Sequence, residues 1–570
     1  MNLRLLPDRE IAMNRDEWGT FFTDVAGVGP GTRYGYVVDG RFYPDPCSAY
    51  QPEGVYAESE VVDHAEYVWQ DAHWHGRPFA GLVFYEVHVG TFTEEGSFEA
   101  MIPRLDELAA IGVTALQLMP VAQCPGRRNW GYDGVFLYGV QNTYGGPLGL
   151  KRLVDACHQR GIAVFLDVVY NHIGGEGNCL GSFGPYFSDK YGTPWGKAMN
   201  FDGEGSDGVR DFVIGNVLYW AEHYHFDGLR LDAVHEMYDR NAVRIWDELH
   251  FAVKGLEERL GRRFYLIAES DTNDPQTVRS PALGGKGFDA QWLDDFHHAL
   301  YVLLHPEGWR NYRDFGAIDQ LAKCYAEGFV HSGEYVYFRR RRHGASAAGV
   351  AGSCFLVFNQ NHDLPGNRPD GKRLAALVSL PVLKLAAAAL LLSPYVPLLF
   401  MGEEYGEDAP FHFFSDYQEE ATKKRLIEGR QRQFASFQFD GEPRDPQDEA
   451  VFRESVLRWE KRREGAHAEL LALHTELLRL RREHPLLADL SKDRLRVDVV
   501  GEKAISIERW SVRRDLRLIC LFNFSAYSPM PLGWYHRDWK LLLAPAPVLD
   551  CVSPQSFAVF EQRVSAPAGG

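Results

Sequence analysis

Short apolar runs of strand length alternate with amphipathic segments through the middle of the chain. Each run is followed by a polar loop and then by residues at helical spacing, such as Phe98, Ile102 and Leu105 behind the helix-capping Ser97. This alternation is typical of βα units in a parallel sheet. It predicts strands at residues 82–89, 112–121, 161–169, 226–234, 263–270, 287–294, 355–363 and 396–404.

Such a series of strands and helices predicts an α/β fold, either a (β/α)8 barrel or a doubly wound open sheet. The polar residues favour the barrel. Carboxylates stand at the carboxyl ends of four different predicted strands, namely Asp167, Asp232, Glu269 and Asp363. Because barrel enzymes assemble their sites from those ends, we expect the active site on that face.

Both ends of the chain have β character. Residues 31–46 read as two strands around the turn Asp39-Gly40. A polar loop is expected over 408–449 and a long helix over 454–483, and a final sheet then follows from apolar runs at 495–500, 504–510, 516–524 and 556–563. We therefore expect an N-terminal β module over 1–79, a catalytic barrel with long loop insertions over 80–486 and a small C-terminal β domain over 487–570.

Charge and hydropathy exclude some classes of partner. The chain has 60 Lys and Arg against 78 Asp and Glu, a net charge of −18, so its field repels nucleic acids and anionic membranes. The apolar stretch 374–400 is interrupted by Pro381, Lys384 and Pro394. These residues predict a buried helix and a buried strand rather than a membrane span.

The cysteines and the first residues predict a cytoplasmic protein. The 8 cysteines lack CxxC spacing, which favours reduced thiols over a zinc ribbon or a disulfide framework. Residues 1–10 lack the basic, apolar and small-residue succession of a secretory signal. No cofactor is expected, and no metal either, because the loop around Asn171 offers no recognisable cluster of oxygen ligands.

Two carboxylates have the surroundings that glycoside chemistry needs. Arg230 stands two residues before Asp232 on one strand, so both side chains point to the same side and the arginine keeps the carboxylate ionised, as a nucleophile requires. Glu269 ends an apolar strand, where desolvation raises the pKa and suits the side chain to donate a proton. The alternatives are a structural ion pair and a capping glutamate.

Four segments in this order, DVVYNH (167–172), GLRLDAVH (228–235), AES (268–270) and QNHD (360–363), resemble the signature regions of the α-amylase superfamily, glycoside hydrolase family 13. The resemblance implies that Asp232 is the nucleophile, Glu269 the general acid/base and Asp363 the carboxylate that stabilises the transition state, with retention of configuration. It implies further substrate-binding residues around the sugar at the cleavage point, namely Tyr132, Asp167, His172, Arg230, His235 and His362.

Longer stretches narrow the resemblance. Segments such as 85–93, 120–134, 288–300 and 398–416 are similar to the maltooligosyltrehalose trehalohydrolase family. The resemblance implies cleavage of the α-1,4 bond next to a terminal trehalose, releasing trehalose and a maltooligosaccharide. It also implies an N-terminal β-sandwich of carbohydrate-binding type, for which residues 1–79 are short, so either the start is internal or the module is trimmed. It implies a pathway partner, the synthase that makes the substrate, with no physical contact implied.

Aromatic and acidic residues near these motifs fit a sugar substrate, because sugar rings stack on aromatic faces. Expected subsite walls are Trp130, Trp195 and Trp292, and expected hydroxyl ligands are Asp294 and Asp295, with core packing or a solvated helix start as the alternative for each. Leu293 and Leu364-Pro365 depart from the family pattern near the leaving-group side.

Three functions follow from these residues. The first is a trehalose-releasing hydrolase, and the second is another enzyme of the superfamily, either a transglycosylase such as an α-glucan branching enzyme or a general α-1,4-glucan hydrolase. The third is a non-catalytic glucan-binding protein, which the intact carboxylates oppose, because a binding module gains nothing from charged carboxylates in a cleft.

Overall fold

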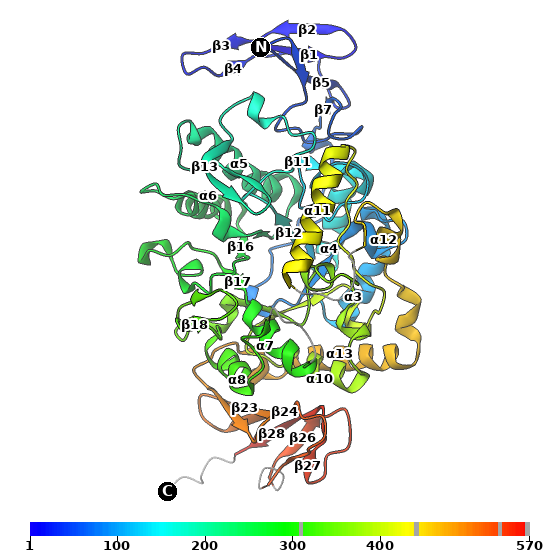
Figure 1. The fold of residues 1–570 in the computed structure, drawn as a ribbon, viewed down its shortest axis with the longest axis vertical. Helices are drawn as coiled ribbons and strands as arrows, with labels where there is room; N and C mark the ends of the chain where they lie inside the picture. The colour runs from blue at the N-terminus through cyan, green and yellow to red at the C-terminus, as the bar shows by residue number, and fades with distance from the viewer. Residues whose placement is uncertain (307–311, 438–443, 534–537, 565–570) are drawn as a thin grey trace.

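The computed structural model of the chain describes residues 1–306, 312–437, 444–533 and 538–564. Within these residues eight parallel strands close into a barrel at the centre of the molecule (Figure 1). The strands are β8 Phe84–Val87, β9 Ala115–Leu118, β12 Ala163–Val168, β15 Gly228–Leu231, β16 Tyr265–Ala268, β17 Ala290–Trp292, β20 Phe355–Phe358 and β21 Val396–Phe400.

Each barrel strand lies inside one of the predicted ranges, so the barrel prediction is confirmed and the open sheet is excluded. The strands are shorter than predicted at their carboxyl ends. Asp232 and Glu269 therefore lie directly after their strands, and Asp363 begins a short helix, α9 Asp363–Gly366, after β20.

Helices pack around the outside of the barrel. Ser97 caps the first of them, accepting a hydrogen bond from the Ala100 N–H at 3.3 Å. The helices are α2 Phe98–Met101, α3 Leu105–Ile111, α4 Gly146–Gln159, α5 Ser206–Tyr224, α6 Ile245–Leu260, α7 Asp294–Leu304, α8 Ile318–Glu327, α10 Leu380–Leu391 and α13 Gly465–Glu483. The predicted buried helix and strand within 374–400 are α10 and β21. No helix among the described residues combines the length and apolar character needed to cross a membrane.

Inward-facing residues divide the barrel interior into an apolar floor and a polar upper layer. Phe165 on β12 is the register partner of Gly228 on β15, and Asp167 is the partner of Arg230 two residues further along. Gly228 is required here, because a Cβ atom at this position would lie 2.5 Å from the Phe165 ring. The floor is therefore filled by aromatic rings, while the next layer toward the catalytic face carries charge.

Below the floor, a buried ion network ties the incoming chain to the barrel. The His158 ring contacts Asp71 through Nδ1 at 2.9 Å and Asp227 through Nε2 at 3.0 Å. Trp74 stacks on the same ring with 4.6 Å between centroids. Burial alone would lower the pKa of His158, but the hydrogen bonds to both carboxylates outweigh it and raise the pKa.

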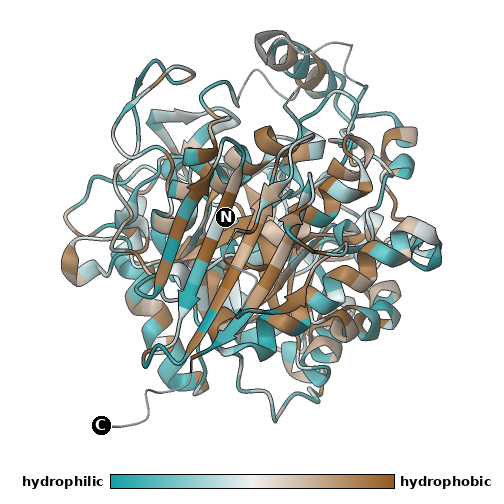
Figure 2. Cartoon of the chain, turned by 90° about the horizontal axis from the view of Figure 1, so that it is seen from below, coloured by the Kyte–Doolittle hydropathy of each residue, from teal (hydrophilic) through white to brown (hydrophobic). Residues whose placement is uncertain are grey.

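Sheets flank the barrel at both ends of the molecule. The N-terminal sheet contains the predicted hairpin, β5 Arg33–Val38 and β6 Arg41–Tyr43, in which Asp39 and Gly40 both have positive φ. The C-terminal sheet has the order β22-β23-β24-β28-β26, so the expected final sheet is confirmed. Its strands are β22 Leu495–Val500, β23 Ala504–Trp510, β24 Leu516–Asn523, β26 Lys540–Leu543 and β28 Ser556–Arg563. Figure 2, seen from this end, shows hydrophobic residues gathered in the strands and in the helix faces behind them. The division at 79/80 and 486/487 stays a prediction.

Two predictions between barrel and C-terminal sheet were wrong. The expected polar loop 408–449 contains an 18-residue helix, α11 Glu420–Phe437. The expected long helix 454–483 is interrupted: α12 Glu449–Glu454 ends at Ser455, a short 3-10 turn follows, and α13 begins only at Gly465. At the break the buried Ser455 hydroxyl donates to the Val451 carbonyl at 2.9 Å, and Gly465, the first residue of α13, has φ 36°.

Candidate active site

Arg230 is the centre of the charged layer at the carboxyl end of the barrel. Its fully buried guanidinium donates to both oxygens of Asp167 at 2.8 and 2.9 Å and to Asp232 at 2.9 Å. Its other amino group lies 3.4 Å from Glu269. The Trp292 ring lies 4.2 Å from the guanidinium carbon and closes the layer from one side. One cation thus holds carboxylates from three successive strands.

A tight turn joins the first two predicted catalytic carboxylates. Ala233, directly after Asp232, has φ 40° and ψ 54°, a left-handed conformation that is costly for a residue with a Cβ atom. The turn directs the Ala233 N–H to Glu269 Oε2 at 2.6 Å, and the Val234 N–H to the Glu269 carbonyl at 3.0 Å. Burial raises the pKa of Glu269, and the charges of Asp232 and Asp363 add to the shift while Arg230 opposes it.

Asp363 is the most open of the three carboxylates, with 42% of its side chain exposed. Its backbone N–H donates to Asn361 Oδ1 at 3.1 Å, and Asn367 Nδ2 donates to its Oδ1 at 3.1 Å. The neighbouring His362 is held by Glu86 of β8, which accepts from Nδ1 at 2.8 Å and from the backbone N–H at 2.9 Å. Burial would lower the pKa of His362, but Asp363 and Glu86 outweigh it and raise the pKa to about 9.

An aromatic and amide wall faces these groups. Tyr132 donates its hydroxyl to Asp167 at 2.7 Å and stacks on His362 with 5.0 Å between ring centroids. Asn171 donates to Asp232 Oδ2 at 2.9 Å and bonds the His172 ring. The structure therefore brings most of the predicted sugar-binding residues to one layer around Arg230.

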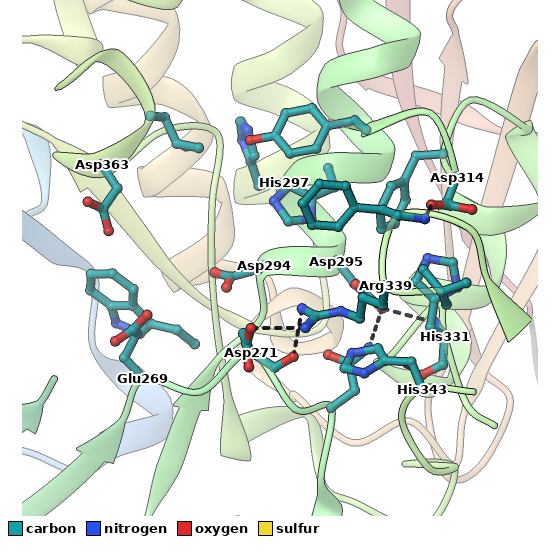
Figure 3. Close-up of a pocket in the computed structure, with 18 of the residues that line it drawn as sticks. Glu269, Asp271, Asp294, Asp295, His297, Asp314, His331, Arg339, His343 and Asp363 are labelled. Atoms are coloured by element: carbon teal, nitrogen blue, oxygen red, sulfur yellow. Dashed lines mark hydrogen bonds and ion pairs between the residues drawn. The ribbon is translucent and has the colours of Figure 1, made fainter. Parts of the chain in front are cut away.

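A cavity of about 290 Å³ opens beside this layer. Glu269, Asp363, Trp292, Asp294 and Leu364 are among the residues that line it, whereas Asp232 is not. Figure 3 shows the side chains of Glu269, Asp294 and Asp363 turned toward the same space. The opposite wall comes from the segment between α7 and β20, where Arg339 pairs with Asp271 at 3.0 Å. Arg339 is the first of four consecutive arginines, 339–342.

Three further residues singled out in the sequence have contacts that set them apart from this layer. The His235 ring lies 3.5 Å from Asp271, and its charge lowers the pKa of Glu269. Leu293 is fully buried in the core outside the cavity, so of the two departures from the family pattern only Leu364 reaches the cavity. Asp295 lines the cavity, but its Oδ2 accepts from the backbone of Val330 and His331, which gives it a structural role.

The three tryptophans predicted as subsite walls also have different surroundings. Trp130 is buried, donates to the His412 carbonyl at 2.8 Å and stacks on Phe411, so it is core packing. Trp195 is 56% exposed and stacks on His172 with 5.4 Å between centroids, at the edge of the charged layer. Trp292 alone of the three lines the cavity.

Sequence reasoning missed two buried polar residues that organise the layer. Glu86 holds His362, and Asn171, considered only as a metal ligand, orients Asp232. Glu86 is two residues after Phe84 on β8, at an inward position. The signal available in the sequence was a charged residue within a largely apolar strand, and the structure buries it fully.

The comparisons with known proteins agree with this geometry. The family model described as "Alpha amylase, catalytic domain" matches residues 60–182. A solved structure from Salmonella typhimurium superposes with a TM-score of 0.90 at 37% identity, covering 99% of this chain and 95% of that one. The barrel and these matches define a glycoside hydrolase of the α-amylase class.

Curated relatives identify the family within that class. The chain is 44% identical over 487 residues to the malto-oligosyltrehalose trehalohydrolase of Saccharolobus solfataricus, covering 85% of this chain and 84% of that one. It is 41% identical over 524 residues to the enzyme of that name from Mycobacterium tuberculosis, covering 90% and 89%. The chain therefore belongs to the malto-oligosyltrehalose trehalohydrolase family.

Proposed function

We propose that the protein hydrolyses the α-1,4 bond next to the terminal trehalose of a maltooligosyltrehalose by a retaining double displacement. The observation that carries the proposal is the Arg230 guanidinium, which binds Asp232 with one amino group and lies beside Glu269 with the other. Two carboxyl groups on one guanidinium have the close spacing that retaining glycosidases need. The names of the relatives supply the substrate.

In the first step Glu269 acts as the acid. Its carboxyl proton passes to the glycosidic oxygen as the bond from that oxygen to the anomeric carbon breaks. Asp232 Oδ attacks the same carbon from the opposite face and forms a β-glycosyl ester, and trehalose leaves. Asp363, open to the cavity, stabilises the positive charge that develops on the sugar ring.

In the second step Glu269 acts as the base. It takes a proton from water while the water oxygen attacks the anomeric carbon and releases Asp232 as a carboxylate. The charge of Asp232 helps to raise the pKa of Glu269 in the free enzyme, and the ester cancels that charge. The pKa of Glu269 therefore falls when a base is needed and rises again when the cycle closes.

The cavity is the site we assign to the leaving disaccharide. It is lined by the acid Glu269 but not by the nucleophile Asp232, as expected for the leaving-group side. Within the described chain, Trp292 Nε1 and His297 Nε2 are buried in its wall without a hydrogen-bond partner. A polyol supplies hydroxyl partners for such groups.

We further propose that this reaction belongs to trehalose biosynthesis in the cytoplasm, after a synthase that makes the terminal trehalose unit. All 8 cysteines are unpaired in the structure, which supports a reducing compartment. No contact with the synthase is proposed.

Product analysis tests the proposal. Wild type and Glu269→Gln are incubated with maltotriosyltrehalose and separately with maltopentaose, and the products are separated by chromatography. We expect wild type to release trehalose and maltotriose rapidly, with little action on maltopentaose. Glu269→Gln should lose about 100-fold or more of this activity, while Glu236→Gln, a matched change on the loop after β15, should not. Equal cleavage of both substrates, or longer or branched products, would instead establish a general hydrolase or a transglycosylase.

A further inference from the structure

Helix α11 crosses between two loops of the catalytic face and is attached to both. At its start, the buried carboxylate of Glu176 accepts from the backbone N–H groups of Gln418 at 2.8 Å and Glu419 at 3.0 Å. Glu176 lies on the loop after β12, the loop that also carries Asn171, the partner of Asp232. Figure 1 shows α11, in yellow, running lengthwise from the side of the N-terminal sheet toward α7.

Farther along α11, Arg430 reaches the loop that carries Asp363. Its guanidinium donates to Asn367 Oδ1 at 2.9 Å and to the Gly366 carbonyl at 2.8 Å. Two rings, Phe413 and Phe434, lie 4.6 and 4.7 Å from its guanidinium carbon. Burial lowers the pKa of Arg430 to about 10, which leaves it charged at neutral pH, and the charge of Asp363 opposes the shift. Two acceptors and two rings fix the plane of the guanidinium.

This contact determines how Asn367 faces Asp363. A guanidinium only donates hydrogen bonds, so the oxygen of the Asn367 amide must point to Arg430. The amide nitrogen then points the other way, and it donates to Asp363 Oδ1 at 3.1 Å. Without Arg430 the amide is free to flip and to present its oxygen to the carboxylate, which repels it.

We propose that Arg430 is a positioning residue that orients the Asp363 carboxylate through the Asn367 amide, and that α11 exists to deliver it. The inference rests on the role proposed above for Asp363. The helix joins the loop beside the nucleophile to the loop of the transition-state carboxylate. One helix therefore holds the residues on both sides of the reacting sugar in place.

A purely structural role for Arg430 predicts a different outcome. Anchoring α11 affects the stability of the helix, and its loss lowers the amount of folded enzyme without a specific effect on the transition state. Orienting Asp363 lowers kcat and leaves substrate binding in the ground state largely unchanged. Arg432 is the matched control, because it lies on the same helix, is 73% exposed and only approaches Glu428 at 3.8 Å.

The experiment compares Arg430→Met, Arg432→Met and Asn367→Ala in the full chain, each alone and combined with Asp363→Asn. With maltotriosyltrehalose, Arg430→Met and Asn367→Ala should lower kcat by about 10- to 100-fold with KM within about twofold of wild type. Arg432→Met should match wild type. In the Asp363→Asn background the further loss from Arg430→Met should fall below about twofold, because the two residues act through one group.

A second readout keeps the inference separate from the substrate assignment. Binding of a cationic iminosugar such as 1-deoxynojirimycin, measured by calorimetry, reports Asp363 as a partner for positive charge without turnover. Arg430→Met should weaken it about as much as it lowers kcat. Failure of wild type to release trehalose would remove the proposed function but leave this comparison intact.

The inference is wrong if Arg430→Met behaves like Arg432→Met in both assays. It is equally wrong if Arg430→Met keeps its full effect in the Asp363→Asn background. Should Arg430→Met fail to fold, Arg430→Lys decides, because a lysine keeps the charge but cannot bind Asn367 and Gly366 together in the same fork. An intermediate loss of kcat supports the inference, and wild-type kcat overturns it.

Discussion

Replacing Arg230 by methionine is expected to move the alkaline limb of the pH profile of kcat/KM upward. The limb reports deprotonation of Glu269 in the free enzyme, since the first step needs its proton. Arg230 lowers the pKa of Glu269 against the effect of burial. Without the guanidinium, burial and the charges of Asp232 and Asp363 are opposed less, by His235, so Glu269 holds its proton to higher pH.

The structure bounds the size of the effect. Arg230 and Glu269 approach to 3.4 Å, which in an effective dielectric constant of about 20 corresponds to at most about 5 kcal/mol. Observed shifts from an adjacent arginine are about 1 to 3 pKa units, and we expect the limb to move by that amount. The substitution also leaves three carboxylates without their cation and should cost about 3 to 5 kcal/mol of unfolding free energy at neutral pH.

The assay is trehalose release from maltotriosyltrehalose from about pH 4 to about pH 10, with the fold checked by urea unfolding. Arg339→Met is the control, because it removes a guanidinium from the far wall of the same cavity. It should leave the limb in place. A limb that stays fixed or moves to lower pH in Arg230→Met would refute the assignment of Glu269 as the acid controlled by this arginine.

Three further predictions follow from the fold and the cavity. His158→Asn should lower stability by about 3 kcal/mol below pH 6 in thermal unfolding. Because the folded state raises the pKa of His158, this contribution is complete below the ordinary histidine pKa and is lost as the pH rises through the raised value, so the variant should approach wild type in alkali. Leu364→Gln should change the ratio of kcat/KM for maltotriosyltrehalose and maltopentaose by about 10-fold or more, since Leu364 lines the cavity, whereas Leu293→Asn should leave that ratio unchanged. Gly366→Ala should cost about 1 to 3 kcal/mol and lower kcat, because its Cβ would meet the Trp130 ring at 2.0 Å; an unchanged urea midpoint would contradict the packing described.

The elements that depend on neighbouring residues in the sequence were predicted correctly. The eight barrel strands and the hairpin at Asp39-Gly40 could be found because buried parallel strands are apolar runs and because such turns need residues that tolerate positive φ. Helix α11 could not be found in this way. Its residues are mostly polar, and its attachments to Glu176 and Asn367 come from 242 and 63 residues away in the sequence.

The same distinction separates the site residues. Asp232 directly follows β15, two residues after Arg230, so the period of the strand accounts for their contact. His235 contacts Asp271, and Asp295 accepts from residues 330–331; these partners belong to other loops, so the positions of both side chains could not be predicted from nearby sequence. Leu293 was placed near the leaving group by its neighbours in sequence, yet the first turn of α7 rotates it into the core.

The turn at Ala233 links the nucleophile to the acid without using the segment between α7 and β20. The two residues after the nucleophile bind the acid: the Ala233 N–H donates to the Glu269 carboxylate and the Val234 N–H to the Glu269 carbonyl, and neither Ala233 nor Val234 lines the leaving-group cavity. The spacing between the Asp232 and Glu269 carboxylates is thus set by the carboxyl ends of β15 and β16. The segment between α7 and β20 supplies the opposite wall of the cavity, and exchanging it for that of another superfamily member should alter which glucan is cleaved while the distance that sets the stereochemistry stays the same.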